Sequence, residues 1–157
     1  MKQILLFVLP IFFVLPATAS AAEINLEVKG VNIGASYKTV VRRLGKPLSK
    51  KTGGANPCGN TKMILRYSGL VIKLDADGNG RNFSVISIEA VSPKWFVAPK
   101  IGVGATLEKV RAKFGRTEKP VKESGLEKLS YFITDGYANF YFRNKKLVRV
   151  IWEENLC

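Results

Sequence analysis

The segment Asp75-Ala-Asp-Gly-Asn-Gly80 has the residue spacing of a loop that could bind a metal ion. Asp75, Asp77 and Asn79 stand at the first, third and fifth positions of a calcium-binding loop, followed by a glycine at the sixth. The twelfth position is Ile86 instead of the glutamate that binds calcium through both oxygens, and strand patterns flank the segment. Asp-Gly and Asn-Gly pairs are also typical of β-hairpin turns. We therefore expect a hairpin turn here, with weak calcium binding as the alternative.

Side chains for enzymatic chemistry are scarce. The sequence contains no histidine, which excludes histidine triads, histidine general bases and histidine metal sites. No serine-hydrolase, phosphate-loop or dinucleotide-binding motif occurs, and the carboxylates are few and scattered. We expect a protein that is not an enzyme and uses no cofactor or metal, with a two-carboxylate hydrolase as the alternative.

The N-terminus indicates export. Met1-Lys-Gln3 is a short basic start, residues 4–16 are almost wholly apolar, and Ala19-Ser-Ala21 fits the small-x-small rule of a cleavage site. The apolar run is shorter than the roughly 20 residues of a spanning helix, and two prolines interrupt it. We predict a signal peptide over residues 1–21 and a mature domain over 22–157, periplasmic or secreted and without a membrane span after processing. A membrane anchor is the alternative.

Two cysteines, Cys58 and Cys157, favour a disulfide bond in an exported protein. This bond would tie the end of the chain to a loop in its first half. It would close a loop of about 100 residues, for which the chain-entropy estimate is about 4–5 kcal/mol. Two free thiols are the alternative.

The charge is strongly basic, since 25 Lys and Arg against 12 Asp and Glu give a formal net charge of +13. Such an excess attracts acidic partners, which include acidic proteins, anionic lipid or lipopolysaccharide, and nucleic acid. Export argues against nucleic acid. Because the basic residues are spread along the chain, solubility explains the charge equally well.

An internal duplication is the most informative pattern. The segment Gly34-Ala-Ser36…Val40…Leu44-Gly45 recurs 70 residues later as Gly104-Ala-Thr106…Val110…Phe114-Gly115. Each copy predicts a short helix, because a hydroxyl side chain can cap its start, one face is apolar, and a glycine follows its end.

Strand patterns follow each helix, as β-branched and aromatic runs separated by turn signals. The strands are expected over 63–67, 70–74 and 83–91 in copy one, and over 129–133, 137–142 and 147–152 in copy two. The polar stretches 49–61 and 118–127 are expected to be flexible. We therefore predict an α+β fold of two pseudo-repeats, each a short helix followed by a three-stranded antiparallel meander. Repeat one covers about 29–91, the linker 92–99, and repeat two about 100–157.

Alternation along these strands predicts one face covered by the helices and one open face. Ile86 is expected on the covered face and Leu147 on the open one. We expect the open face and the linker to supply the partner-binding residues, because Tyr, Trp and Arg are favoured anchors in protein interfaces. These residues are Tyr137, Asn139, Tyr141, Arg143, Arg149, Lys73 and Trp95. Packing within the protein is the alternative for the aromatic ones.

The tandem arrangement of capped helix and antiparallel strands, in an exported chain with one disulfide, resembles the β-lactamase inhibitor protein fold. The segment G-A-[ST]-x-x-x-V-x-x-x-[LF]-G also resembles the small lipoproteins of the outer-membrane β-barrel assembly machine. In the inhibitor family the sheet grips another protein, so the resemblance implies protein binding through the open face. The chain lacks the lipobox cysteine of the lipoproteins.

These patterns together predict an exported, non-enzymatic protein-binding module of the inhibitor, immunity or envelope-assembly type. The expected partner is another protein, acidic in character, in the envelope or outside the cell, and not nucleic acid. The alternative function is binding of anionic envelope material such as lipopolysaccharide or cell-wall polymer.

Overall fold

The structure, a computed structural model, describes residues 24–55, 58–115, 119–134 and 136–155. Two helices and ten strands are assigned in these ranges. The helices are α1 (Tyr37–Leu44) and α2 (Leu107–Phe114). The strands are β1 (Ser49–Ala55), β2 (Thr61–Tyr67), β3 (Leu70–Ala76), β4 (Phe83–Ala90), β5 (Phe96–Ala98), β6 (Ile101–Gly102), β7 (Val121–Glu123), β8 (Leu126–Ile133), β9 (Gly136–Arg143) and β10 (Lys146–Glu154).

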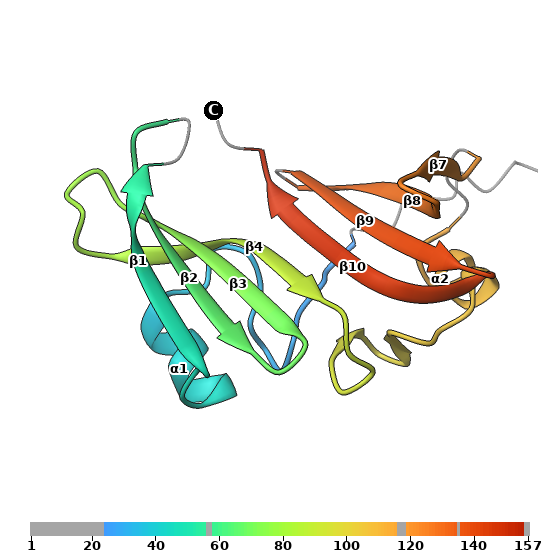
Figure 1. The fold of residues 1–157 in the computed structure, drawn as a ribbon, viewed down its shortest axis with the longest axis horizontal. Coiled ribbons are helices and arrows are strands. Elements are labelled where there is room, and N and C mark those ends of the chain that lie inside the picture. Colours follow the sequence, from blue (N-terminus) through green and yellow to red (C-terminus); the bar gives the residue numbers. More distant parts are fainter. Residues whose placement is uncertain (1–23, 56–57, 116–118, 135, 156–157) are drawn as a thin grey trace, which may run out of the picture.

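Eight of the strands form one antiparallel sheet in the order β1-β2-β3-β4-β10-β9-β8-β7 (Figure 1). The sheet therefore consists of two four-stranded halves that meet where β4 pairs with β10. This central pairing is short and joins Ser87–Ala90 to Val150–Glu153. On either side of it the two strands diverge (Figure 1). The remaining strands, β5 and β6, form a separate two-stranded ribbon.

The predicted α+β fold of helix-plus-three-strand repeats is wrong. The protein is mostly β, and each helix is followed by four strands of a single sheet. The six predicted strands are present, but the polar stretches expected to be flexible contain two more, β1 and β7. β1 has the sequence Ser-Lys-Lys-Thr-Gly-Gly-Ala with every residue exposed, so it carries no hydrophobic alternation. It forms because it hydrogen-bonds along β2 at the edge of the sheet.

The hydrophobic core lies on one face of the sheet. Val40 of α1 and Val110 of α2 are fully buried there, against apolar side chains from all the long strands. The extended segment 24–33 adds Leu26, Val28 and Val31 to the same core. It passes behind the region where β4 and β10 meet (Figure 1). In the described ranges, the helices and this segment leave the opposite face, here called the open sheet face, uncovered.

Both copies of the recurring segment adopt the predicted helix with its predicted caps. The hydroxyl of Ser36 accepts a hydrogen bond from the Thr39 amide, and the hydroxyl of Thr106 accepts one from the Lys109 amide. Each helix ends at a glycine with positive φ, Gly45 after α1 and Gly115 after α2. These bonds satisfy amides at the helix starts that have no partner within the helix.

The Gly-Ala pair before each cap attaches the helix to the sheet. The Gly34 amide donates to the Val85 carbonyl over 2.8 Å, and the Val85 amide donates to the Ala35 carbonyl over 2.9 Å. The Gly104 and Ala105 pair makes the same two bonds with Leu147 of β10. The motif thus pairs with β4 and β10 where these strands diverge and would otherwise leave backbone groups unpaired. This structural role explains the recurrence of the motif.

Two β-bulges change which side chains face the core. In β4 the register with β3 shifts so that Val85 pairs with Leu74, and in β10 the register with β9 shifts so that Leu147 pairs with Phe142. Val85 and Leu147 are consequently buried, whereas Ile86 is half-buried. The predicted faces of Ile86 and Leu147 are therefore wrong, because an extra residue in one strand inverts the alternation beyond it.

Candidate functional site

The open sheet face is continuous across both halves of the sheet. The β-pairings align outward-facing side chains in rows that cross five strands. One row runs through Lys73, Ser87, Glu153, Tyr137 and Phe132, each residue being paired with the next. The central β4–β10 pairing therefore joins the surfaces of the two halves into one continuous face.

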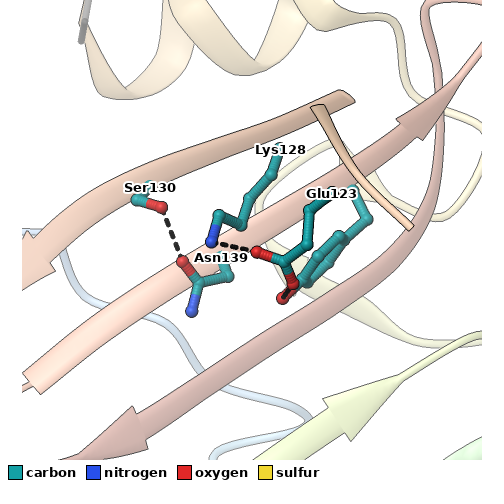
Figure 2. A network of polar contacts seen from close by, with 5 residues as sticks. Glu123, Lys128, Ser130 and Asn139 are labelled. Carbon is teal, nitrogen blue, oxygen red and sulfur yellow. Dashed lines mark hydrogen bonds and ion pairs between the residues drawn. The ribbon is translucent and has the colours of Figure 1, made fainter. Parts of the chain in front are cut away.

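Several residues predicted to bind a partner lie on this face and are accessible. Lys73 and Arg143 are exposed, and the Tyr137 side chain is 38% exposed. Asn139 and Arg149 are half-buried. Asn139 accepts a hydrogen bond of 2.7 Å from the Ser130 hydroxyl through its Oδ1 atom (Figure 2). The structure brings these side chains to one face, and their role in binding stays a prediction.

Tyr141 also belongs to the open face, where it was expected to be accessible to a partner. Only 6% of it is exposed, so this expectation of accessibility is corrected. Its ring is covered by Arg149, whose guanidinium carbon lies 4.0 Å from the ring centroid. Its hydroxyl donates to Oε1 of Glu123 over 3.2 Å. The other oxygen of Glu123 forms an ion pair with Lys128 (Figure 2). Tyr141 is therefore part of a polar cluster that closes this part of the face.

The charges in this cluster stabilise one another. The hydrogen bond from Lys128 lowers the pKa of Glu123, and the same contact raises the pKa of Lys128. Burial raises the pKa of Tyr141, so its phenol stays protonated. The cluster holds Glu123 as a carboxylate and Lys128 as an ammonium at neutral pH. This arrangement links β7 to β8 and β9 through side-chain contacts.

Trp95 is also unavailable to a partner, because its side chain is 3% exposed. Its indole N–H donates to the Ser68 carbonyl over 2.8 Å, and its ring meets Tyr67 edge-to-face at 6.5 Å. The ammonium groups of Lys29 and Lys94 lie 5.4 and 5.0 Å from its centroid. Trp95 therefore packs within the core, which was the alternative left open for the aromatic residues.

Phe132 is an exposed aromatic residue that was not among the predicted partner-binding residues. It lies beside Tyr137 on the open face, with ring centroids 4.8 Å apart, and 77% of it is exposed. Alternation within Leu129–Ile133 could have identified it, since Leu129 and Tyr131 face the core. Together Phe132 and Tyr137 are called the aromatic pair.

A pocket of about 310 Å³ lies on the same face beside the central pairing. Its walls carry opposite charges: Lys62 and Lys73 come from β2 and β3, and Glu153 and Glu154 come from β10. Ile64 and Ile86 add apolar surface. The pocket can receive a side chain of a partner, and its mixed lining favours a partner surface with charges of both signs.

The hairpin turn expected over residues 75–80 is present, and it joins the antiparallel strands β3 and β4. Asp77 holds the turn together, because its Oδ1 accepts from the backbone amides of Arg81 and Asn82, and its Oδ2 accepts from the Asn82 side chain. The Asn82 side-chain bond is the main reason why the pKa of Asp77 is lowered. Among the described residues, no group of three or more acidic, cysteine or histidine side chains is placed to hold a metal ion.

The predicted disulfide concerns one cysteine inside the described ranges and one outside them. Cys58 is not a free thiol. Cys157 lies outside the described residues, so the pairing of the two stays a prediction.

No helix in the described part of the chain is long and apolar enough to cross a membrane. The predicted signal peptide over 1–21 also lies outside that part.

No protein-family model matches the sequence, and the comparison with curated proteins found no match either. Among solved structures, the chain is similar to an extracellular protein with an SCP domain from Bacillus anthracis, with a TM-score of 0.54 and 13% identity. The alignment covers 87% of this chain and 49% of that one, so the chain spans about half the length of that protein. A DUF4309 family protein from Bacillus subtilis aligns over 81% of this chain and 84% of its own, at 13% identity and a TM-score of 0.48. At this identity the likeness to the Bacillus anthracis protein concerns the fold alone.

Proposed function

We propose that this chain is an exported, non-enzymatic module that binds another protein through its open sheet face. The binding would be stoichiometric and of the inhibitor, immunity or envelope-assembly type that the sequence resemblance implies. The observation that carries the proposal is the aromatic pair, Phe132 and Tyr137, on a sheet face that no described helix covers. The apolar leader supports export of the chain.

The aromatic pair is suited to anchor a partner. A phenylalanine that is 77% exposed leaves a large apolar area in water, and burying such area is favourable by about 25 cal/mol per Å². Both rings stand on neighbouring paired strands, which fix the backbone beneath them, and aromatic side chains have few rotatable bonds, so little side-chain entropy is lost on binding. The two rings also contact each other, so they present one continuous aromatic surface.

The rest of the face determines what kind of partner fits. Lys73 and Arg66 are exposed on the β1–β4 half, whereas Glu153 is exposed beside the aromatic pair on β10. The pocket between them is lined by charges of both signs. A partner with an apolar centre and mixed charges around it matches this face better than a uniformly acidic one.

The test is a pull-down from envelope extract with the processed protein, comparing wild type with the double variant Phe132→Ala/Tyr137→Ala. We expect one stoichiometric partner to be retained by wild type and its Kd to rise at least tenfold in the variant, because truncated interface anchors cost about 2 kcal/mol or more. The matched control is Phe96→Ala, which removes a 59% exposed phenylalanine from the β5–β6 ribbon.

Equal loss of the partner in the double variant and in Phe96→Ala would contradict the proposal, because it would show nonspecific hydrophobic adhesion. Retention of full affinity by the double variant would also contradict it. Turnover of a cell-wall, lipid or peptide substrate by the purified protein would show that the chain is an enzyme. Thermal unfolding of each variant confirms that the fold is intact.

A further inference from the structure

The first half of the chain contains a long stretch without acidic residues. Between Glu27 and Asp75 there are ten Lys and Arg and no Asp or Glu. The open sheet face, in contrast, carries acidic residues, among them Glu89 on β4, Glu153 on β10 and Glu123 on β7. The strongest positive charge therefore gathers around α1 and the strands next to it, and not at the aromatic pair.

α1 carries part of this charge in a row along one flank. Lys38 and Arg42 are both exposed and lie one turn apart, so their charges repel each other. No ion pair among the described residues involves either of them. The helix also has no acidic residue in its first turn, where one would stabilise it. Arg42 stands in the last turn, where a cation is favourable, whereas Lys38 stands in the first turn, where a cation is unfavourable.

Comparison with α2 shows that the fold does not require this row. The recurring segment places Glu108 and Ala112 of α2 at the positions of Lys38 and Arg42 in α1. Both helices have the same length, the same caps and the same hydrogen bonds to the sheet. Since α2 forms the same capped helix without these two cations, a helix at this place in the fold does not depend on them.

An exposed leucine lies next to the charged flank. Leu48 follows α1 and is 78% exposed, the highest value among the large hydrophobic residues that are exposed. Lys46 and Lys50 are exposed on either side of it in the sequence. Lys50 lies against α1, with its ammonium 4.4 Å from the centroid of the Tyr37 ring. These contacts place the start of β1 beside the helix, on the side of the sheet away from the open face.

We propose that α1 and the start of β1 bind the surface of a bilayer with anionic headgroups. The binding residues are Lys38, Arg42, Lys46, Leu48 and Lys50, called the α1 basic surface. Each basic residue close to such a surface strengthens binding by about fivefold. Leu48 enters the headgroup region, because an apolar side chain among basic ones is typical of protein segments that lie on a membrane. This leucine favours a lipid surface over a soluble polyanion.

The test is co-sedimentation of the processed protein, which lacks the apolar leader, with two kinds of vesicle. One contains phosphatidylcholine alone, and the other also contains phosphatidylglycerol. We expect binding to the anionic vesicles only, and weaker binding as salt screens the charges. The variant Lys38→Glu/Arg42→Ala gives α1 the residues of α2 and is expected to lower the partition coefficient at least tenfold.

The matched control is Lys109→Ala/Lys113→Glu, which lowers the net charge by the same amount on the exposed side of α2. We expect it to lower binding much less than the α1 variant. Equal loss in both variants would overturn the proposal in favour of attraction by net charge. Absence of binding to anionic vesicles by the wild-type protein would overturn it outright.

A third variant, Leu48→Ser, separates a lipid surface from a soluble polyanion because it leaves the charge unchanged. We expect it to weaken vesicle binding severalfold. Undiminished binding by this variant, together with complete competition by inorganic polyphosphate, would overturn the lipid assignment in favour of a soluble polyanion. Circular dichroism melting curves establish that all three variants are folded. The aromatic pair is intact in each, so these results are independent of the proposed protein binding.

Discussion

Arg149 covers the ring of Tyr141, with its guanidinium carbon 4.0 Å from the ring centroid. The two residues are paired across β9 and β10, so the contact follows from the register of the strands. The two tyrosines of the open sheet face therefore differ: Tyr141 is covered by Arg149, whereas Tyr137 is accessible to solvent.

This difference predicts opposite consequences for two similar substitutions. Tyr141→Ala should lower the free energy of unfolding by about 3–5 kcal/mol, because it removes a buried aromatic ring. Tyr137→Ala should change it by less than about 1 kcal/mol, because its ring is partly in water. Urea denaturation of both variants measures the two values. Equal effects would show that the open face is not divided in this way.

The ion pair between Glu123 and Lys128 predicts a loss of stability in acid. The pKa of Glu123 is lowered in the folded protein, mainly by the hydrogen bond from Lys128, so the folded state binds this proton less readily than the unfolded chain. Its stabilising contribution is therefore complete above the ordinary pKa of 4.5 and is lost as the pH falls through the lowered value.

Urea midpoints measured from pH 7 to pH 3 test this effect. Glu123→Gln should make the decline below pH 4.5 shallower than in wild type. Glu153→Gln, at an exposed glutamate of the same face, is the control and should leave the slope nearly unchanged. A wild-type slope in Glu123→Gln would contradict the assigned role of the ion pair.

Gly45 is predicted to be required because of its backbone conformation, and not because a larger side chain would collide with its neighbours. Its φ of 81° and ψ of −168° lie in a region that is essentially restricted to glycine, yet a Cβ there would meet no atom within 4 Å. Gly45→Ala should therefore destabilise the protein by about 1–3 kcal/mol. Gly78 also has free space but no positive φ, so Gly78→Ala should be neutral or slightly stabilising. Thermal unfolding of the two variants decides the matter.

The predicted disulfide has a direct chemical test. Thiol titration of the denatured, unreduced protein should find no free cysteine, and reduction should release two. The double variant Cys58→Ser/Cys157→Ser should lose about 2–4 kcal/mol of stability. Two titratable thiols before reduction would contradict the bond.

Local signals in the sequence predicted the local structure well. Ser36, Thr106, Gly45 and Gly115 marked the starts and ends of both helices, because capping chemistry depends on a few neighbouring residues. The six apolar strands were also predicted from local sequence, because the alternation of apolar residues within each strand reflects burial of one face. The hairpin turn at Asp77 was also predicted from its own residues.

Features that depend on pairing between distant strands could not be predicted. β1 contains polar residues, two glycines and one alanine, all of them exposed, and it is a strand only because it pairs with the edge of β2. The bulges at Ile86 and Val148 are defined by registers with β3 and β9, and they moved Leu147 into the core. The covering of Tyr141 by Arg149 also depends on such pairing, because the two residues lie opposite each other on β9 and β10. Phe132 differs, since the alternation of its own strand indicates that it faces outward.

β10 is the last strand of the described sheet in the sequence, yet it occupies the middle of the sheet between β4 and β9. A ribosome must therefore have made the chain as far as Glu154 before the two halves can join. Until then β4 and β9 both expose backbone edges that could pair with other molecules. Late synthesis of β10 therefore favours a chain that stays unfolded until this strand has been made, and transport of an extended polypeptide through a narrow channel requires an unfolded chain as well.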